Sequence, residues 1–68
     1  MLRITNSSVN FEGVISNTEA VEIATISGSV NTDSIYVNMH SYDLQKTKDA
    51  KDEIVKDVAE FTDLLLSR

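Results

Sequence analysis

His40 is the only histidine of the chain and the side chain best suited to acid–base chemistry. Asp43 follows three residues later, and a histidine beside a carboxylate could act as a general base. However, no serine or cysteine nucleophile motif accompanies this pair, and there is no second histidine. The pattern is more typical of a solvent-facing residue on a strand, so we predict no catalytic residue and no enzyme activity.

Metal and cofactor sites are not predicted either. The chain has no cysteine, which excludes disulfides and thiolate zinc sites. The segment Asn31-Thr32-Asp33 is similar to a fragment of a calcium-binding loop, but it lacks the glycine and the terminal glutamate of such a loop. A β-turn is the better interpretation of this segment. No phosphate-binding loop or dinucleotide fingerprint is present, so we expect no cofactor.

Four carboxylates could form an acidic ridge along a predicted helix. They are separated by four, four and three residues, and they are Asp49, Glu53, Asp57 and Glu60. Such a ridge could imitate DNA phosphates and block a nucleic-acid-binding protein. Three lysines interrupt the ridge, and they are Lys48, Lys51 and Lys56. An ordinary solvated helix face is therefore the simpler interpretation.

The composition indicates one small globular domain, residues 1–68. The hydrophobic share of 41% and the charged share of 25% are close to those of ordinary folded proteins. The net charge of −5 argues against direct binding to nucleic acid or to an anionic membrane surface. Neither a signal peptide nor the roughly 20 apolar residues of a membrane span is visible. We therefore expect a soluble cytoplasmic protein.

Period-two alternation predicts an antiparallel sheet of three or four strands within residues 2–41. Short strands are expected at 2–5, 9–15, 20–27 and 34–41, with turn-forming residues between them. Val9, Phe11 and Ile15 share one parity, and Gly13 between them favours a bulge. In the third strand the apolar parity switches at Ala24, which indicates a bulge, a twist or burial on both faces.

The strand at 34–41 has the cleanest alternation. One face carries the apolar residues Ile35, Val37 and Met39. The opposite face, which Asn10 and Glu12 are expected to share, carries Tyr36, Asn38 and His40. If that face is bare, its tyrosine and polar residues are a candidate protein-binding surface. Any solvated face of a sheet has a similar composition.

A single amphipathic helix is predicted at about 44–66, with Asp43 or Thr47 able to cap its first turn. Helical spacing gathers one apolar stripe that can cover the sheet. Its members are Ala50, Ile54, Val58, Phe61 and Leu65.

A second set of residues makes the helix more apolar than one packing contact requires. It lies about 100° around the helix from the stripe. The set consists of Val55, Ala59, Thr62 and Leu66. A second interface, between the helices of a homodimer or with another protein, would explain this surplus. A sheet that wraps further around the helix, or a frayed last turn, would explain it equally.

The fold class that follows is α+β, an antiparallel β-meander of three or four strands packed against one C-terminal α-helix. The expected function is that of a non-enzymatic accessory or interaction protein, self-associating through the helix. The alternative is an acidic inhibitor of a nucleic-acid-binding protein. The small size and the lack of a catalytic motif also fit proteins that phages and other mobile elements encode.

Overall fold

The computed structural model describes residues 1–7 and 10–67 of the chain. Of Asn6 and Ser7 it describes the backbone only. The turn-forming residues predicted between the first two strands lie partly outside the described residues, and Val9, with the parity predicted for it, lies wholly outside them.

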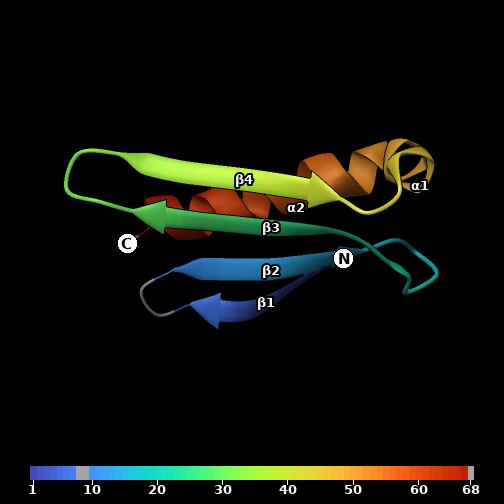
Figure 1. Cartoon of the computed structure of the whole chain (residues 1–68), viewed down its shortest axis with the longest axis horizontal. Helices are drawn as coiled ribbons and strands as arrows, with labels where there is room; N and C mark the ends of the chain where they lie inside the picture. Colours follow the sequence, from blue (N-terminus) through green and yellow to red (C-terminus); the bar gives the residue numbers. More distant parts are fainter. Residues whose placement is uncertain (8–9, 68) are drawn as a thin grey trace.

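Four antiparallel strands form one sheet in the order in which they follow along the chain (Figure 1). They are β1 (Leu2–Ser7), β2 (Phe11–Ser16), β3 (Glu22–Val30) and β4 (Ile35–Ser41). Two helical segments follow, and the longer one crosses the back of the sheet in the view of Figure 1. The predicted α+β meander with a C-terminal helix is confirmed, and the number of strands is four.

The sheet contains two register shifts that change which face of the sheet the side chains point to. In β1, Ile4 pairs with Gly13 and Asn6 pairs with Glu12, so Thr5 is the extra residue. The bulge predicted at Gly13 therefore lies in the partner strand, across from Gly13, and not in β2 itself. In β3, Glu22 pairs with Ser16 and Ala24 pairs with Ile15, which leaves Ile23 as an extra residue. A bulge is thus the reason for the parity switch near Ala24, because one inserted residue exchanges the two faces of a strand.

The core lies between one face of the sheet and the longer helix. Its buried side chains come from β2, β3 and the helix, and they are Phe11, Ile15, Ile23, Ala24, Ile26, Ile54, Phe61 and Leu65. The helix packs directly over Gly28 of β3. A methyl group built on Gly28 would lie 2.8 Å from Leu65 Cδ1 and 3.1 Å from Phe61 Cε2. The absence of a side chain at Gly28 is what allows this close packing.

The C-terminal region is divided into α1 (Leu44–Asp49) and α2 (Lys51–Leu66) rather than one continuous helix. Asp43 is the N-cap, and its side chain accepts a hydrogen bond from Lys46 N at 3.1 Å. The chain bends at Ala50, whose backbone angles are φ −101° and ψ 28°. Buried Thr47 explains why α1 takes its own direction, since its hydroxyl donates to Asp43 O and contacts the Ser41 hydroxyl, both at 2.7 Å. These bonds hold α1 against the end of β4, while α2 turns to cross the sheet.

Candidate functional site

The predicted second apolar set on α2 is on the surface of the molecule. Val55 is 61% exposed and Leu66 is 65% exposed, while Ala59 is also exposed. Thr62 is half-buried, and its hydroxyl donates to Val58 O at 2.8 Å. We call Val55, Ala59, Thr62 and Leu66 the α2 flank. The sheet does not wrap around the helix far enough to cover it.

The opposite side of α2 faces the β1–β2 end of the sheet. The Met1 ammonium lies 2.6 Å from Glu53 Oε1 and 3.0 Å from Asp57 Oδ2, and it also donates to Ser16 O in β2. Glu53 and Asp57 point roughly opposite to Val55 and Ala59 when residues are placed at 100° intervals. The α2 flank therefore faces the other side of the sheet, where β4 lies.

β4 offers a second exposed apolar surface beside this flank. Its register with Val30, Gly28 and Ile26 of β3 places Ile35, Val37 and Met39, in that order, on the helix-covered face of the sheet. All three remain between 37% and 41% exposed, because α2 packs mainly over β2 and β3. The sequence predicted that these three residues share one face of the strand, and the register confirms it. We call Ile35, Val37 and Met39 the β4 apolar row.

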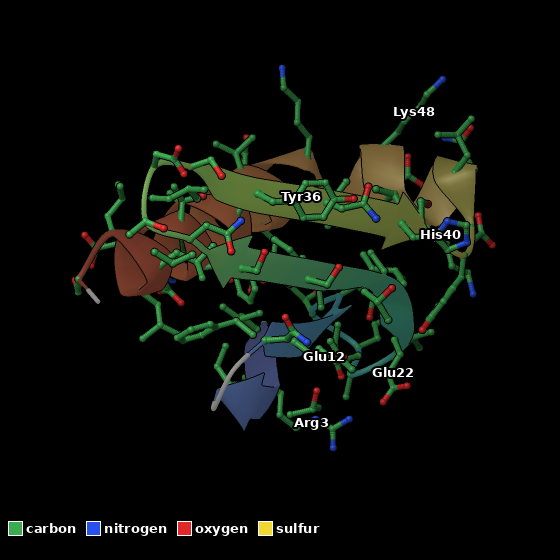
Figure 2. All side chains as sticks on the ribbon, turned by 60° about the vertical axis from the view of Figure 1, so that its left-hand side comes forward. Arg3, Glu12, Glu22, Tyr36, His40 and Lys48 are labelled. Atoms are coloured by element: carbon green, nitrogen blue, oxygen red, sulfur yellow. The ribbon has the colours of Figure 1, made fainter. Side chains whose placement is uncertain are left out.

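The helix-free face of the sheet carries the candidate surface of Tyr36, Asn38 and His40. Figure 2 shows Tyr36 and His40 along β4, and Glu12 further down the same sheet. Small residues of β3 pair with this set, because Tyr36 is opposite Ser29 and His40 is opposite Thr25. Between β2 and β4, Ser27, Gly28 and Ser29 of β3 line a shallow hollow of about 260 Å³. The three candidates thus share one open face, as their parity predicted.

His40 is not placed as a general base with Asp43. Its ring meets the Tyr42 ring edge to face, with 6.1 Å between centroids and 68° between planes. The Asp43 carboxylate caps α1 through Lys46 N. No hydrogen bond or ion pair between His40 and Asp43 occurs within the described part of the chain, so the arrangement provides no acid–base pair.

The predicted acidic ridge is wrong as a continuous surface, because its third carboxylate is buried. Asp57 is only 2% exposed, and Oδ2 meets the Met1 ammonium as an ion pair without forming a well-directed hydrogen bond. Asp49 and Glu60 remain exposed, but Glu53 is half-buried beside the same ammonium. The ridge failed because the sequence pattern could not show that Met1 reaches this side of α2.

The Met1 ammonium and the Glu53 carboxylate shift each other's pKa. Burial lowers the pKa of the Met1 ammonium, but the contacts with Glu53 and Asp57 and their negative charges raise it more, so it lies above its ordinary value of 8.0. The hydrogen bond from the ammonium, aided by its positive charge, lowers the pKa of Glu53 below 4.5. The cluster therefore favours the charged forms of both groups and joins the chain start to α2.

A wider hollow of about 790 Å³ opens beside the bend between α1 and α2. The β2–β3 loop forms one wall, and the polar lining includes Asn17, Glu19, Lys46, Asp49 and Asp52. Charges of both signs are mixed along this lining. The arrangement does not single out one ligand chemistry.

Comparisons with protein-family models, with curated proteins and with solved structures find no match for this chain. Within residues 1–7 and 10–67, no three His, Cys, Asp or Glu side chains come together as a metal site. Neither α1 nor α2 is long and apolar enough to cross a membrane. The α2 flank and the β4 apolar row are two exposed apolar surfaces that lie on the same side of the molecule.

Proposed function

We propose that this protein is a non-catalytic interaction protein that works as a homodimer joined through the α2 flank. The observation that carries the proposal is the exposure of Val55 and Leu66 on a helix whose inward face already packs against the sheet through Ile54, Phe61 and Leu65. Full burial of one such side chain is worth roughly 1.5–3 kcal/mol. A second copy that covers both residues in each chain would recover much of this free energy.

The small size of the chain gives a further reason for association. A domain of 68 residues buries only about 60% of the surface that its unfolded chain exposes, and it has no disulfide to compensate. Ala59 in the middle of the flank is small, so it would let a second helix approach closely. Self-association would therefore add stability where a single copy has little.

Binding is favoured over catalysis by the placement of the titratable side chains. His40 contacts Tyr42 on an open face, and the carboxylates of α2 are divided between solvent and the Met1 ammonium. The acidic inhibitor has less support as an alternative, because burial of Asp57 interrupts the ridge that would imitate phosphates. Charge reversal at Asp49 and Glu60 would still test it against a captured partner.

Light scattering over a concentration series tests the homodimer. We expect a mass of twice 7.5 kDa for the wild-type protein and a monomer for the double variant Val55→Glu/Leu66→Glu. Lys56→Glu is the matched control, since it makes the same change in net charge at an exposed position of α2. The control should remain a dimer, and circular dichroism should show that each variant is folded. A wild-type monomer at every concentration, or a double variant of unchanged mass, would contradict the proposal.

A further inference from the structure

The two edges of the sheet differ in their protection against pairing with another strand. The β1 edge carries a bulge between Ile4 and Asn6, and Arg3 of β1 forms an ion pair with Glu22 at 3.0 Å. Bulges and charged side chains are the usual means by which an edge strand avoids pairing. β4 pairs with β3 in unbroken register from Ile35 to Ser41, and its sequence contains no Lys, Arg, Asp, Glu or Pro. The β4 edge is therefore open to a further strand.

The backbone groups at this open edge can be assigned from the ladder. Asn31 N donates to Ser34 O at 2.8 Å at one end of the hairpin, and Tyr42 N donates to Ile23 O at 2.9 Å at the other. Residues of an antiparallel strand alternate between bonding one neighbour and the other. The even-numbered residues of β4 thus bond to β3, and the N–H and C=O groups of Ile35, Val37 and Met39 point outward. The β4 apolar row is also the row of outward-facing backbone groups.

We propose that a second copy of the chain pairs its β4 antiparallel with the first, with Val37 on the two-fold axis. This inference rests on the proposed homodimer and specifies how the copies join, as one continuous eight-stranded sheet. Val37 then lies opposite Val37 of the second copy, and Ile35 lies opposite Met39. On the other face of the sheet, Tyr36 lies opposite Asn38.

The pairing is self-complementary in hydrogen bonding and in side-chain type. Outward-facing residues must lie opposite one another to form hydrogen-bonded pairs, and an axis at Val37 meets this requirement for all three residues of the β4 apolar row. Every such pair joins two apolar side chains, which is the favourable combination across strands. The strand that best matches the β4 edge is therefore β4 itself.

Charge also favours a second copy over a basic partner. Each chain has a net charge of −5, so two copies repel one another unless their contact excludes the acidic side chains. β4 meets this condition, because the nearest acidic residues, Asp33 and Asp43, lie beyond its two ends. With Val37 on the axis, Asp33 lies opposite Ser41 rather than another carboxylate. A basic partner would gain no charge contact from this uncharged strand.

The same axis places both α2 helices on one face of the joined sheet. Val37 pairs with Gly28, and Phe61 and Leu65 of α2 pack over Gly28, so the turn of α2 that holds Thr62 and Leu66 lies level with the axis. α2 packs mainly over β2 and β3, and neighbouring strands lie about 4.8 Å apart, so the two helices face each other across both β4 strands and do not pack directly on one another. The strand pairing is therefore the main contact of this dimer, and the α2 flanks lie at its rim.

A single introduced cysteine can test this register, because the chain has no cysteine of its own. A hydrogen-bonded antiparallel pair has its Cα atoms about 5.5 Å apart, within the range of a disulfide. We expect the Val37→Cys variant to form a disulfide-linked dimer as its main product under mild oxidation. The matched control is Ile4→Cys, since Ile4 on the β1 edge is 38% exposed and Val37 is 37% exposed. That control should remain largely uncrosslinked.

Two further cysteine variants test the axis, and two lysine variants test the edge. Tyr36→Cys alone and Asn38→Cys alone should crosslink poorly, whereas an equimolar mixture of the two should give the heterodimer.

Val37→Lys should turn the dimer into a folded monomer, and Ile4→Lys should not. If the wild type is a dimer but Val37→Cys crosslinks no more than Ile4→Cys, strand pairing is excluded and the homodimer stands. A wild-type monomer excludes both proposals. If the crosslinked dimer still forms in the presence of Val55→Glu/Leu66→Glu, the strand pairing stands and the helix contact is excluded.

Discussion

Leu65 and Leu66 are consecutive residues of α2, yet Leu65 is completely buried and Leu66 projects into solvent. Leu65 packs over Gly28 in β3, where a side chain on the strand would collide with it. Leu66 lies one residue, or about 100°, further around the helix and faces the β4 side. The boundary between the core and the exposed surface therefore runs between these two leucines.

Truncation of the two leucines should have very different effects. We expect Leu65→Ala to lower the free energy of unfolding by about 2–5 kcal/mol, because it leaves a cavity between helix and sheet. Leu66→Ala should change it by no more than about 0.5 kcal/mol at a protein concentration low enough to keep the chain monomeric. Urea unfolding followed by circular dichroism measures both. Equal losses for the two variants would show that Leu66 is part of the monomer core.

Gly28 should not tolerate a side chain. Its Cβ would lie 2.6 Å from Tyr36 O as well as against Leu65 and Phe61, so either β4 or α2 must move. We expect Gly28→Ala to destabilise the fold by about 1–3 kcal/mol, as overpacking usually does. Ser27→Ala on the other face of β3 is the control and should be close to neutral. Thermal unfolding compares the variants, and an unaffected Gly28→Ala protein would mean that the helix lies further from the sheet.

The loop between β2 and β3 contains a residue whose replacement should stabilise the protein. Ala20 has φ 63°, in the left-handed region that costs a residue with a Cβ about 1–2 kcal/mol. Glycine removes this strain. It also makes the unfolded chain more flexible, which lowers the free energy of unfolding by about 0.4–1 kcal/mol. We expect Ala20→Gly to increase the free energy of unfolding by up to about 1 kcal/mol. Glu19→Gly, which relieves no such strain, should decrease it, and the reverse order would argue against this turn geometry.

Stability should fall in alkaline solution when the chain carries a free ammonium at Met1. The pKa of this group is raised in the folded state, so its contribution is complete below about pH 8 and is lost as pH rises through the folded pKa. The lowered pKa of Glu53 has the opposite effect, and its contribution is lost as pH falls below its ordinary value of 4.5.

Amino-terminal acetylation provides the control for this pH dependence. It removes the positive charge and leaves the buried Asp57 carboxylate without its ion-pair partner. We expect the acetylated protein to be less stable at pH 7 and to show a smaller loss between pH 7 and pH 10, as measured by denaturant titration. Identical pH profiles for the free and acetylated proteins would show that the ammonium contact adds nothing to the fold.

Local spacing determined much of what the sequence alone could predict. Strand parity placed Ile35, Val37 and Met39 on one face and Tyr36, Asn38 and His40 on the other, and helical spacing identified Phe61 and Leu65 as core residues. The parity switch near Ala24 allowed a bulge, a twist or burial on both faces, and the register shows that the bulge is the correct alternative. These features were predictable because each depends on the repeat of one strand or one helix, and neighbouring residues fix that repeat.

Only the tertiary structure decided how far each surface is covered. It left β4 at an open edge, placed α2 over β2 and β3, and buried Asp57 against the Met1 ammonium. It also divided the predicted helix at Ala50, where Thr47 holds α1 against Ser41. These outcomes depend on contacts between residues far apart in the chain. Periodicity shows which side of an element is apolar, but the distance to another element determines whether that side is buried.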